Sequence, residues 1–132
     1  MSIVISPLLR KALIADAFLS GVAALLLVAG GAVLGPVMAL PAGLLAGAGL
    51  LLVPYAGALV LAARRDVLPR ALVLGVVMLN AVWVVASLLL LVAGPVAPNA
   101  LGIAFVLLQA LAVAVFAEMQ AIGLRRSAPA VA

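Results

Sequence analysis

The sequence has no cysteine and no histidine among its 132 residues, and this removes several kinds of chemistry. Disulfide exchange and thiolate metal sites need cysteine, and bis-histidine haem ligation needs histidine. The only lysine, Lys11, precedes the first long apolar stretch, which argues against a buried Schiff base. No serine stands beside a catalytic base. We therefore expect no cofactor, no metal site and no enzymatic activity.

Charged side chains are also scarce, at 8% of residues, whereas soluble proteins carry about 25%. They fall near positions 10–16, 64–70 and 118–126, and the stretches 17–63 and 71–117, of 47 residues each, have none. The chain is 70% hydrophobic. So short a chain cannot hide that much apolar surface from water, because its surface-to-volume ratio is too high. The sequence predicts an integral membrane protein surrounded by a lipid bilayer.

Each uncharged stretch is long enough for two membrane crossings, since one spanning helix needs about 20 apolar residues. The apolar runs lack the two-residue alternation of barrel strands, which favours helices. Turns are expected where glycine and proline divide the stretches, at Gly30-Gly31, Gly35-Pro36, Gly94-Pro95 and Pro98-Asn99. The predicted fold is an all-α, up-down four-helix bundle forming a single domain over 1–126. Its spans are about 12–34, 37–62, 71–93 and 100–123, and a flexible tail covers 127–132.

The two halves of the chain resemble each other at an offset of 64 residues. The run LLLVAG occurs at 25–30 and again at 89–94, and Asp16 occupies the position that corresponds to Asn80. Paired arginines follow the second span of each half. This pattern indicates a duplicated helical hairpin, a parallel repeat about an axis along the membrane normal. A chance likeness between Leu/Ala/Val runs is the alternative.

All seven basic residues lie near the two termini or in the segment between the second and third spans. The other two connections have none. The positive-inside rule therefore predicts a multi-pass protein of the cell inner membrane with both termini in the cytoplasm. The same rule accounts for the net charge of +4 as orientation charge beside anionic headgroups, so no nucleic acid partner is expected.

Polar side chains within the spans are few, and an ionisable one is costly in lipid and usually faces the protein interior. Asp16 and Ser20 share a helix face because they are four residues apart. Tyr55, in the middle of the second span, suits either packing or a cavity. The alternative for each carboxylate is pairing with a nearby basic residue. The candidates to line a cytoplasm-facing polar cavity are Asp16, Ser20, Asn80, Trp83, Glu118 and Gln120.

Such a cavity is typical of a transporter or channel for a small solute or ion, which is the function we expect. The alternative is a non-catalytic accessory or assembly subunit of a larger membrane complex. That alternative predicts a dry bundle in which a partner covers either the face of the fourth span with Gln109, Phe116 and Gln120 or the glycine-rich face. Four helices are few to enclose a path, so we expect a homo-oligomer or a membrane-protein partner.

Overall fold

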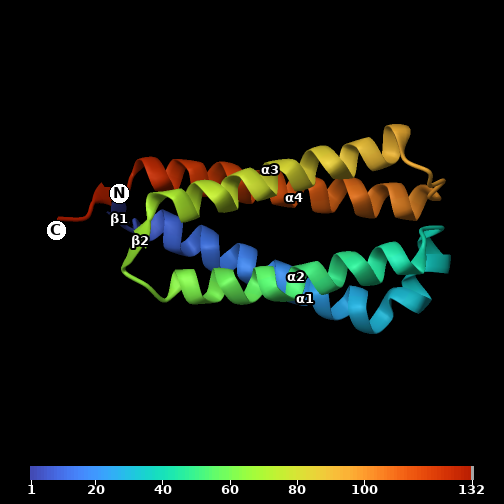
Figure 1. Ribbon diagram of the computed structural model, residues 1–132. Helices are drawn as coiled ribbons and strands as arrows, with labels where there is room; N and C mark the ends of the chain where they lie inside the picture. Colours follow the sequence, from blue (N-terminus) through green and yellow to red (C-terminus); the bar gives the residue numbers. More distant parts are fainter. Residues whose placement is uncertain (132) are drawn as a thin grey trace.

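The computed structural model describes residues 1–131 and contains four long helices that run alternately up and down (Figure 1). They are α1 (Pro7–Met38), α2 (Ala42–Ala63), α3 (Arg70–Ala93) and α4 (Ala100–Arg125). Each is long and apolar enough to cross a membrane. The predicted all-α membrane bundle is confirmed. Ala132, the last residue of the tail predicted to be flexible, lies outside the described residues.

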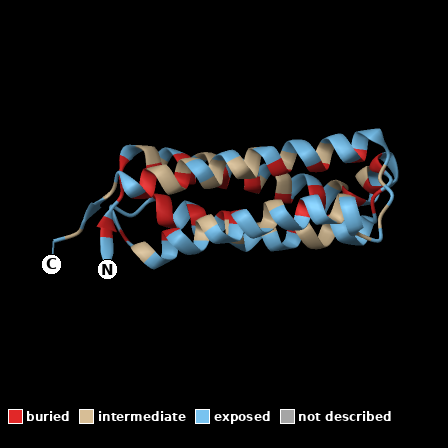
Figure 2. Cartoon of the chain, turned by 90° about the horizontal axis from the view of Figure 1, so that it is seen from above, coloured by how far each residue is buried: buried red, intermediate tan, exposed pale blue. Residues whose placement is uncertain are grey.

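Large apolar side chains cover the outside of the bundle. Exposed residues occur along the full length of the helices (Figure 2). Phe18 on α1 is 72% exposed and Val92 on α3 is 85% exposed. Water would disfavour so much exposed apolar surface, whereas the hydrocarbon of a bilayer accommodates it. The outer surface of the bundle is therefore suited to contact with lipid.

The first helix is longer than the sequence suggested and continues through Gly31 and Gly35 to Met38. These glycines serve helix contact rather than a turn. A Cβ atom on Gly35 would lie 2.9 Å from the carbonyl oxygen of Leu40, and one on Gly31 would lie 3.6 Å from the amide nitrogen of Ala46. The chain reverses after them, at Ala39, which adopts a left-handed conformation with φ of 53°.

The helices pack in the order α2, α1, α4, α3. Extended backbone contacts join α1 to α2, α1 to α4 and α3 to α4, whereas α2 and α3 barely approach each other in the described part of the chain. In Figure 1, α1 and α2 accordingly form one pair and α3 and α4 the other. Extended backbone contact joins the helices on three sides of the bundle, whereas α2 and α3 meet through side chains, including Leu59 and Val73.

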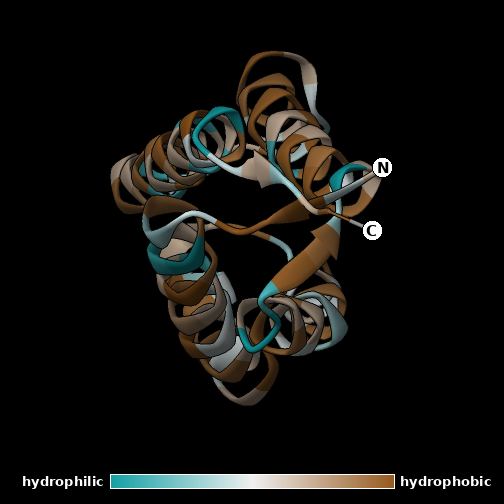
Figure 3. Ribbon diagram, turned by 90° about the vertical axis from the view of Figure 1, so that its left-hand side faces the viewer, coloured by the Kyte–Doolittle hydropathy of each residue, from teal (hydrophilic) through white to brown (hydrophobic). Residues whose placement is uncertain are grey.

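A small antiparallel sheet lies across the end of the bundle where both termini are found (Figure 3). Its strands are β1 (Ser2–Val4), β2 (Val67–Pro69) and β3 (Ala128–Pro129), in the order β2-β1-β3. Strands this short carry no periodic signal, so the sequence did not predict them. At the same end, Arg10 joins α1 to the end of α2. It donates to the carbonyl oxygen of Ala63 and pairs with Asp66 at 2.8 Å.

The opposite end is held by Asn99, which caps α4 and also reaches α1. Its Oδ1 accepts from the amide of Gly102 at 2.9 Å, which satisfies a free donor of the first helical turn. Its Nδ2 donates to the carbonyl of Val37 at 2.7 Å. The α1–α4 contact is thus fixed at the loop end, where the sequence had suggested only a turn.

Gly123 tests the α1–α4 contact at the sheet end. A Cβ there would lie 2.7 Å from the Cα of Leu9, which is backbone and cannot move aside. We expect Gly123→Ala to lower the free energy of unfolding in detergent by about 1–3 kcal/mol through overpacking. Circular dichroism during SDS titration measures the change.

The matched control is Gly75→Ala on α3, where no atom lies within 4 Å of the added Cβ. Alanine favours a helix over glycine by up to about 1 kcal/mol, so this variant should be as stable as the wild type or slightly more stable. Equal stability of the two alanine variants would contradict the packing at Gly123.

Candidate functional site

One polar side chain from each helix meets at a common point inside the bundle. Asp16 comes from α1, Tyr55 from α2, Asn80 from α3 and Gln120 from α4, and Ser20 adds a second group from α1. We call these five residues the polar cluster. Asp16, Asn80 and Gln120 are 1%, 4% and 0% exposed, while Tyr55 is half-buried. A site shared by all four helices is therefore built around a buried carboxyl group.

The Asp16 carboxyl contacts four hydrogen-bond donors. Its Oδ1 accepts from the Ser20 hydroxyl at 3.0 Å, and its Oδ2 lies 2.9 Å from the Tyr55 hydroxyl. Oδ2 also lies 3.0 Å from Nδ2 of Asn80 and 2.7 Å from Nε2 of Gln120. Hydrogen bonds replace the water that a carboxyl group loses on burial, because an unsatisfied polar group in the interior is costly.

The other members of the cluster also contact one another. Asn80 donates from Nδ2 to Oε1 of Gln120 at 2.9 Å, and its Oδ1 lies 2.7 Å from the Tyr55 hydroxyl. Among the described residues, no buried side-chain nitrogen or oxygen lacks a hydrogen-bond partner. The cluster is a closed network, and its side chains pack on one another.

No basic side chain contacts Asp16 among the described residues. Arg10, a basic residue close to Asp16 in the sequence, instead pairs with Asp66 in the segment after α2. Lys11 is exposed. The alternative of an ion pair for Asp16 is therefore not what the structure shows. The Asp16 carboxyl group is held by neutral side chains from all four helices.

Trp83 lies in a separate group of polar contacts between α3 and α4. Its Nε1 donates to Oε1 of Gln109 at 2.8 Å, and Nε2 of Gln109 lies 2.9 Å from the Ser87 hydroxyl. The Ser87 hydroxyl donates to the backbone carbonyl of Trp83 at 2.7 Å. This group joins the second hairpin internally and has no hydrogen bond to the polar cluster.

Glu118 is exposed on α4 and has neither an ion pair nor a hydrogen bond within the described chain. Gln120, two residues later, is buried. The two side chains differ in exposure because residues two apart point to different sides of a helix. Of the six sequence candidates, the structure brings Asp16, Ser20, Asn80 and Gln120 together. It places Trp83 in the neighbouring group and Glu118 on the surface.

Sequence reasoning left Tyr55 out of the candidate site. A buried tyrosine hydroxyl usually has a hydrogen-bond partner, so its mid-span position was a signal. What the sequence does not give is the rotation of α2 relative to α1, because α2 is apolar on all sides apart from this residue. Only the packed bundle shows that the hydroxyl points to Asp16.

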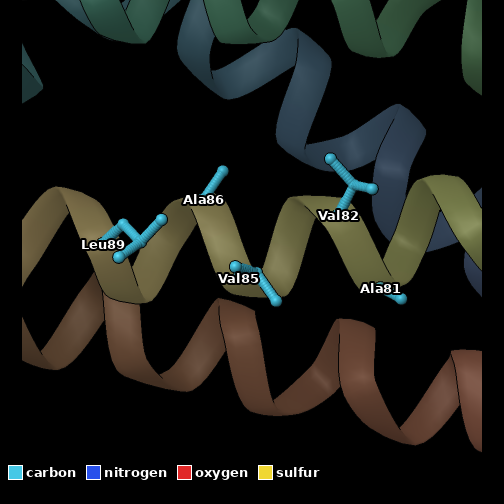
Figure 4. Close-up of a pocket in the computed structure, with 5 residues that line it drawn as sticks. All are labelled: Ala81, Val82, Val85, Ala86 and Leu89. Carbon is cyan, nitrogen blue, oxygen red and sulfur yellow. The ribbon is translucent and has the colours of Figure 1, made fainter.

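Two grooves on the bundle surface lie away from the polar cluster. One runs along α3 and is lined only by apolar side chains, including Val82, Val85 and Leu89 (Figure 4). Another, between α1 and α2, is lined by apolar side chains and Arg64. Neither includes a residue of the polar cluster. The described residues also contain no group of three or more acidic side chains that would hold a metal ion.

No known protein family, curated protein or solved structure matches this chain. The fold and the site therefore define the class by themselves. The protein is a small multi-pass membrane protein whose four helices meet at a buried carboxyl group.

Asn80 tests the coupling of the helices at this point, since its amide contacts α1, α2 and α4. We expect Asn80→Ala to lower the free energy of unfolding by about 1–3 kcal/mol, because buried partners lose their hydrogen bonds. The control is Leu79→Ala, a lipid-facing neighbour whose truncation should change stability little. SDS titration followed by circular dichroism compares the two, and a smaller loss at Asn80 than at Leu79 would contradict the network.

Proposed function

We propose that the protein is a small transporter in which Asp16 binds and releases a proton as a solute or ion crosses the membrane. The observation that carries this proposal is a buried carboxyl group bonded to all three other helices and to no cation. Ionisable residues within membrane spans typically mark ion pathways and proton relays. The proposal assigns the protein no enzymatic activity.

A change of charge at Asp16 alters the contacts of every helix at once. When ionised, the carboxylate only accepts hydrogen bonds, and when protonated it also donates one. The polar cluster thus has two hydrogen-bond arrangements with the same side chains. A transporter needs such an element with two states, which a bound ligand shifts by binding one state better.

The position of Asp16 along α1 favours proton exchange from the sheet end. Asp16 is nine residues beyond the start of α1, about 14 Å along a helix that continues much further. The basic residues that are exposed gather at the same end, and they include Lys11, Arg64 and Arg125. By the positive-inside rule we propose that this end faces the cytoplasm and that the membrane is the cell inner membrane.

The absence of cysteine allows the orientation to be tested without background labelling. Ala97→Cys in the α3–α4 connection and Ala128→Cys in β3 both replace exposed residues and keep every charge. A membrane-impermeant maleimide added to intact cells should label Cys at 97 and should label Cys at 128 only after the membrane is permeabilised. The reverse pattern would refute the proposed orientation.

Asp16→Asn tests the proton site while keeping the size of the side chain. A rapid pH change across proteoliposomes on a solid-supported membrane should give a transient current from proton binding to the wild type. We expect this current to disappear in Asp16→Asn, because an amide does not exchange its charge.

The matched control is Glu118→Gln, the same chemical change at an exposed position outside the cluster. Its current should equal that of the wild type. A current that persists in Asp16→Asn would refute Asp16 as the proton site.

A second candidate function is that of an accessory or assembly subunit, and the closed hydrogen-bond network of the polar cluster favours it. Gln120 is fully buried, and the described cluster has no unpaired polar atom. A closed network of this kind also serves to fix helix positions. Cross-linking in native membranes separates the two candidates, since a subunit would give a stoichiometric partner and the wild type would give no current.

A further inference from the structure

If Asp16 is ionised, the polar cluster has one more short contact than it has hydrogens directed into these contacts. Six donor–acceptor contacts of 2.7–3.0 Å join its five side chains. Ser20 and Tyr55 offer one hydrogen each, and the Asn80 amide offers two. Gln120 directs one hydrogen to Asp16. One contact is therefore left without a hydrogen.

The shortage falls on Tyr55. Its hydroxyl has a single hydrogen but lies between two oxygens, Oδ2 of Asp16 at 2.9 Å and Oδ1 of Asn80 at 2.7 Å. It cannot donate to both. A hydrogen on the Asp16 carboxyl completes the network, because Asp16 then donates to the Tyr55 oxygen and Tyr55 donates to Asn80.

We propose that Asp16 is protonated in this structure and that Tyr55 transmits the loss of this proton to the contact between α2 and α3. When the proton leaves to water, Tyr55 turns its only hydrogen from Asn80 to the Asp16 carboxylate. Oδ1 of Asn80 then has no donor. The inference rests on the proposed role of Asp16 and makes Tyr55 the positioning residue that couples its charge to helix separation.

The α2–α3 side is where such a change has the largest effect. It is the side of the bundle without extended backbone contact, and Tyr55 to Asn80 is the side-chain hydrogen bond that crosses it. Tyr55 is also the half-buried member of an otherwise buried cluster. Once Oδ1 of Asn80 loses its donor, water that enters beside Tyr55 hydrogen bonds to this oxygen. The two hairpins then separate on the α2–α3 side.

The surroundings of Asp16 assign the pH response to Asp16 itself. The groups that face it are Ser20 on α1, Tyr55 on α2, and the neutral amides of Asn80 and Gln120 on α3 and α4. The other two acids, Asp66 and Glu118, are exposed, so they do not face the cluster.

Spin labels measure the separation directly in this cysteine-free chain. Val53→Cys on α2 and Val85→Cys on α3 place labels at exposed positions on the two sides, and pulsed dipolar spectroscopy in liposomes gives their distance at acidic and alkaline pH. We expect a longer distance at alkaline pH. A control pair on the packed helices α1 and α4, Leu26→Cys and Leu108→Cys, should not change.

Two variants in the labelled background should each abolish the pH response. Asp16→Asn stays neutral and should give the same distance at both pH values. Tyr55→Phe removes the hydroxyl, so Asn80 has no donor and the distance should be long at both. A wild-type distance that does not depend on pH, or a wild-type pH response retained in Tyr55→Phe, would overturn the inference.

Infrared spectroscopy of the wild type provides a test that does not require Tyr55→Phe to fold. The chain has three carboxylic side chains, of which only Asp16 is buried. A protonated carboxyl band should be present at the pH of the short distance, and its component from the buried Asp16 should be absent in Asp16→Asn. Its absence from the wild type at that pH would overturn the inference. If the current depends on Asp16 but the distance does not change with pH, the role of Tyr55 is refuted and the proposed function stands. If the current persists in Asp16→Asn, the proposed function itself is refuted.

Discussion

The requirement that Asp16 be satisfied by protein rather than by water determines how the four helices face one another. Inside hydrocarbon, no solvent is available to a carboxyl group, so its partners must come from neighbouring helices. The helices are apolar on nearly all sides, and an apolar face gives no preference between protein and lipid. Tyr55, Asn80 and Gln120 supply that preference, because each must point inward to reach Asp16.

The two hairpins use different means to hold their helices together, although their sequences correspond. Asp16 and Asn80 occupy equivalent positions of the repeat and hydrogen bond to each other at 3.0 Å. In the first hairpin, Gly49 lets α2 pack closely on α1. A Cβ added to Gly49 would lie 3.0 Å from the backbone nitrogen of Val28. In the second, Trp83 and Gln109 bond across α3 and α4. If the hairpin is duplicated as the sequence predicts, its two copies retain polar residues at the centre while their internal contacts differ.

The sequence predicted the fold class because charge and apolar length are strong, local signals. Four of the six residues proposed to line a polar cavity lie in the polar cluster, as expected if polar residues in lipid face inward. It misplaced the first turn because Gly35-Pro36 suits both a turn and a helix contact. It included Glu118 because the sequence position of a carboxylate near the membrane edge does not show whether its side chain faces the bundle interior or the outside. It omitted Tyr55 because the rotation of α2 depends on tertiary packing.

The small sheet has a consequence for how the chain is made. Its central strand β1 comes from residues 2–4, but its partners come from residues 67–69 and 128–129. Residues 2–4 can therefore complete their pairing only after residues 128–129 have been synthesised. The sheet closes only after all four helices have been synthesised, so its formation marks the end of assembly rather than its beginning. A chain shortened before β3 would keep its four helices and leave one edge of β1 unpaired.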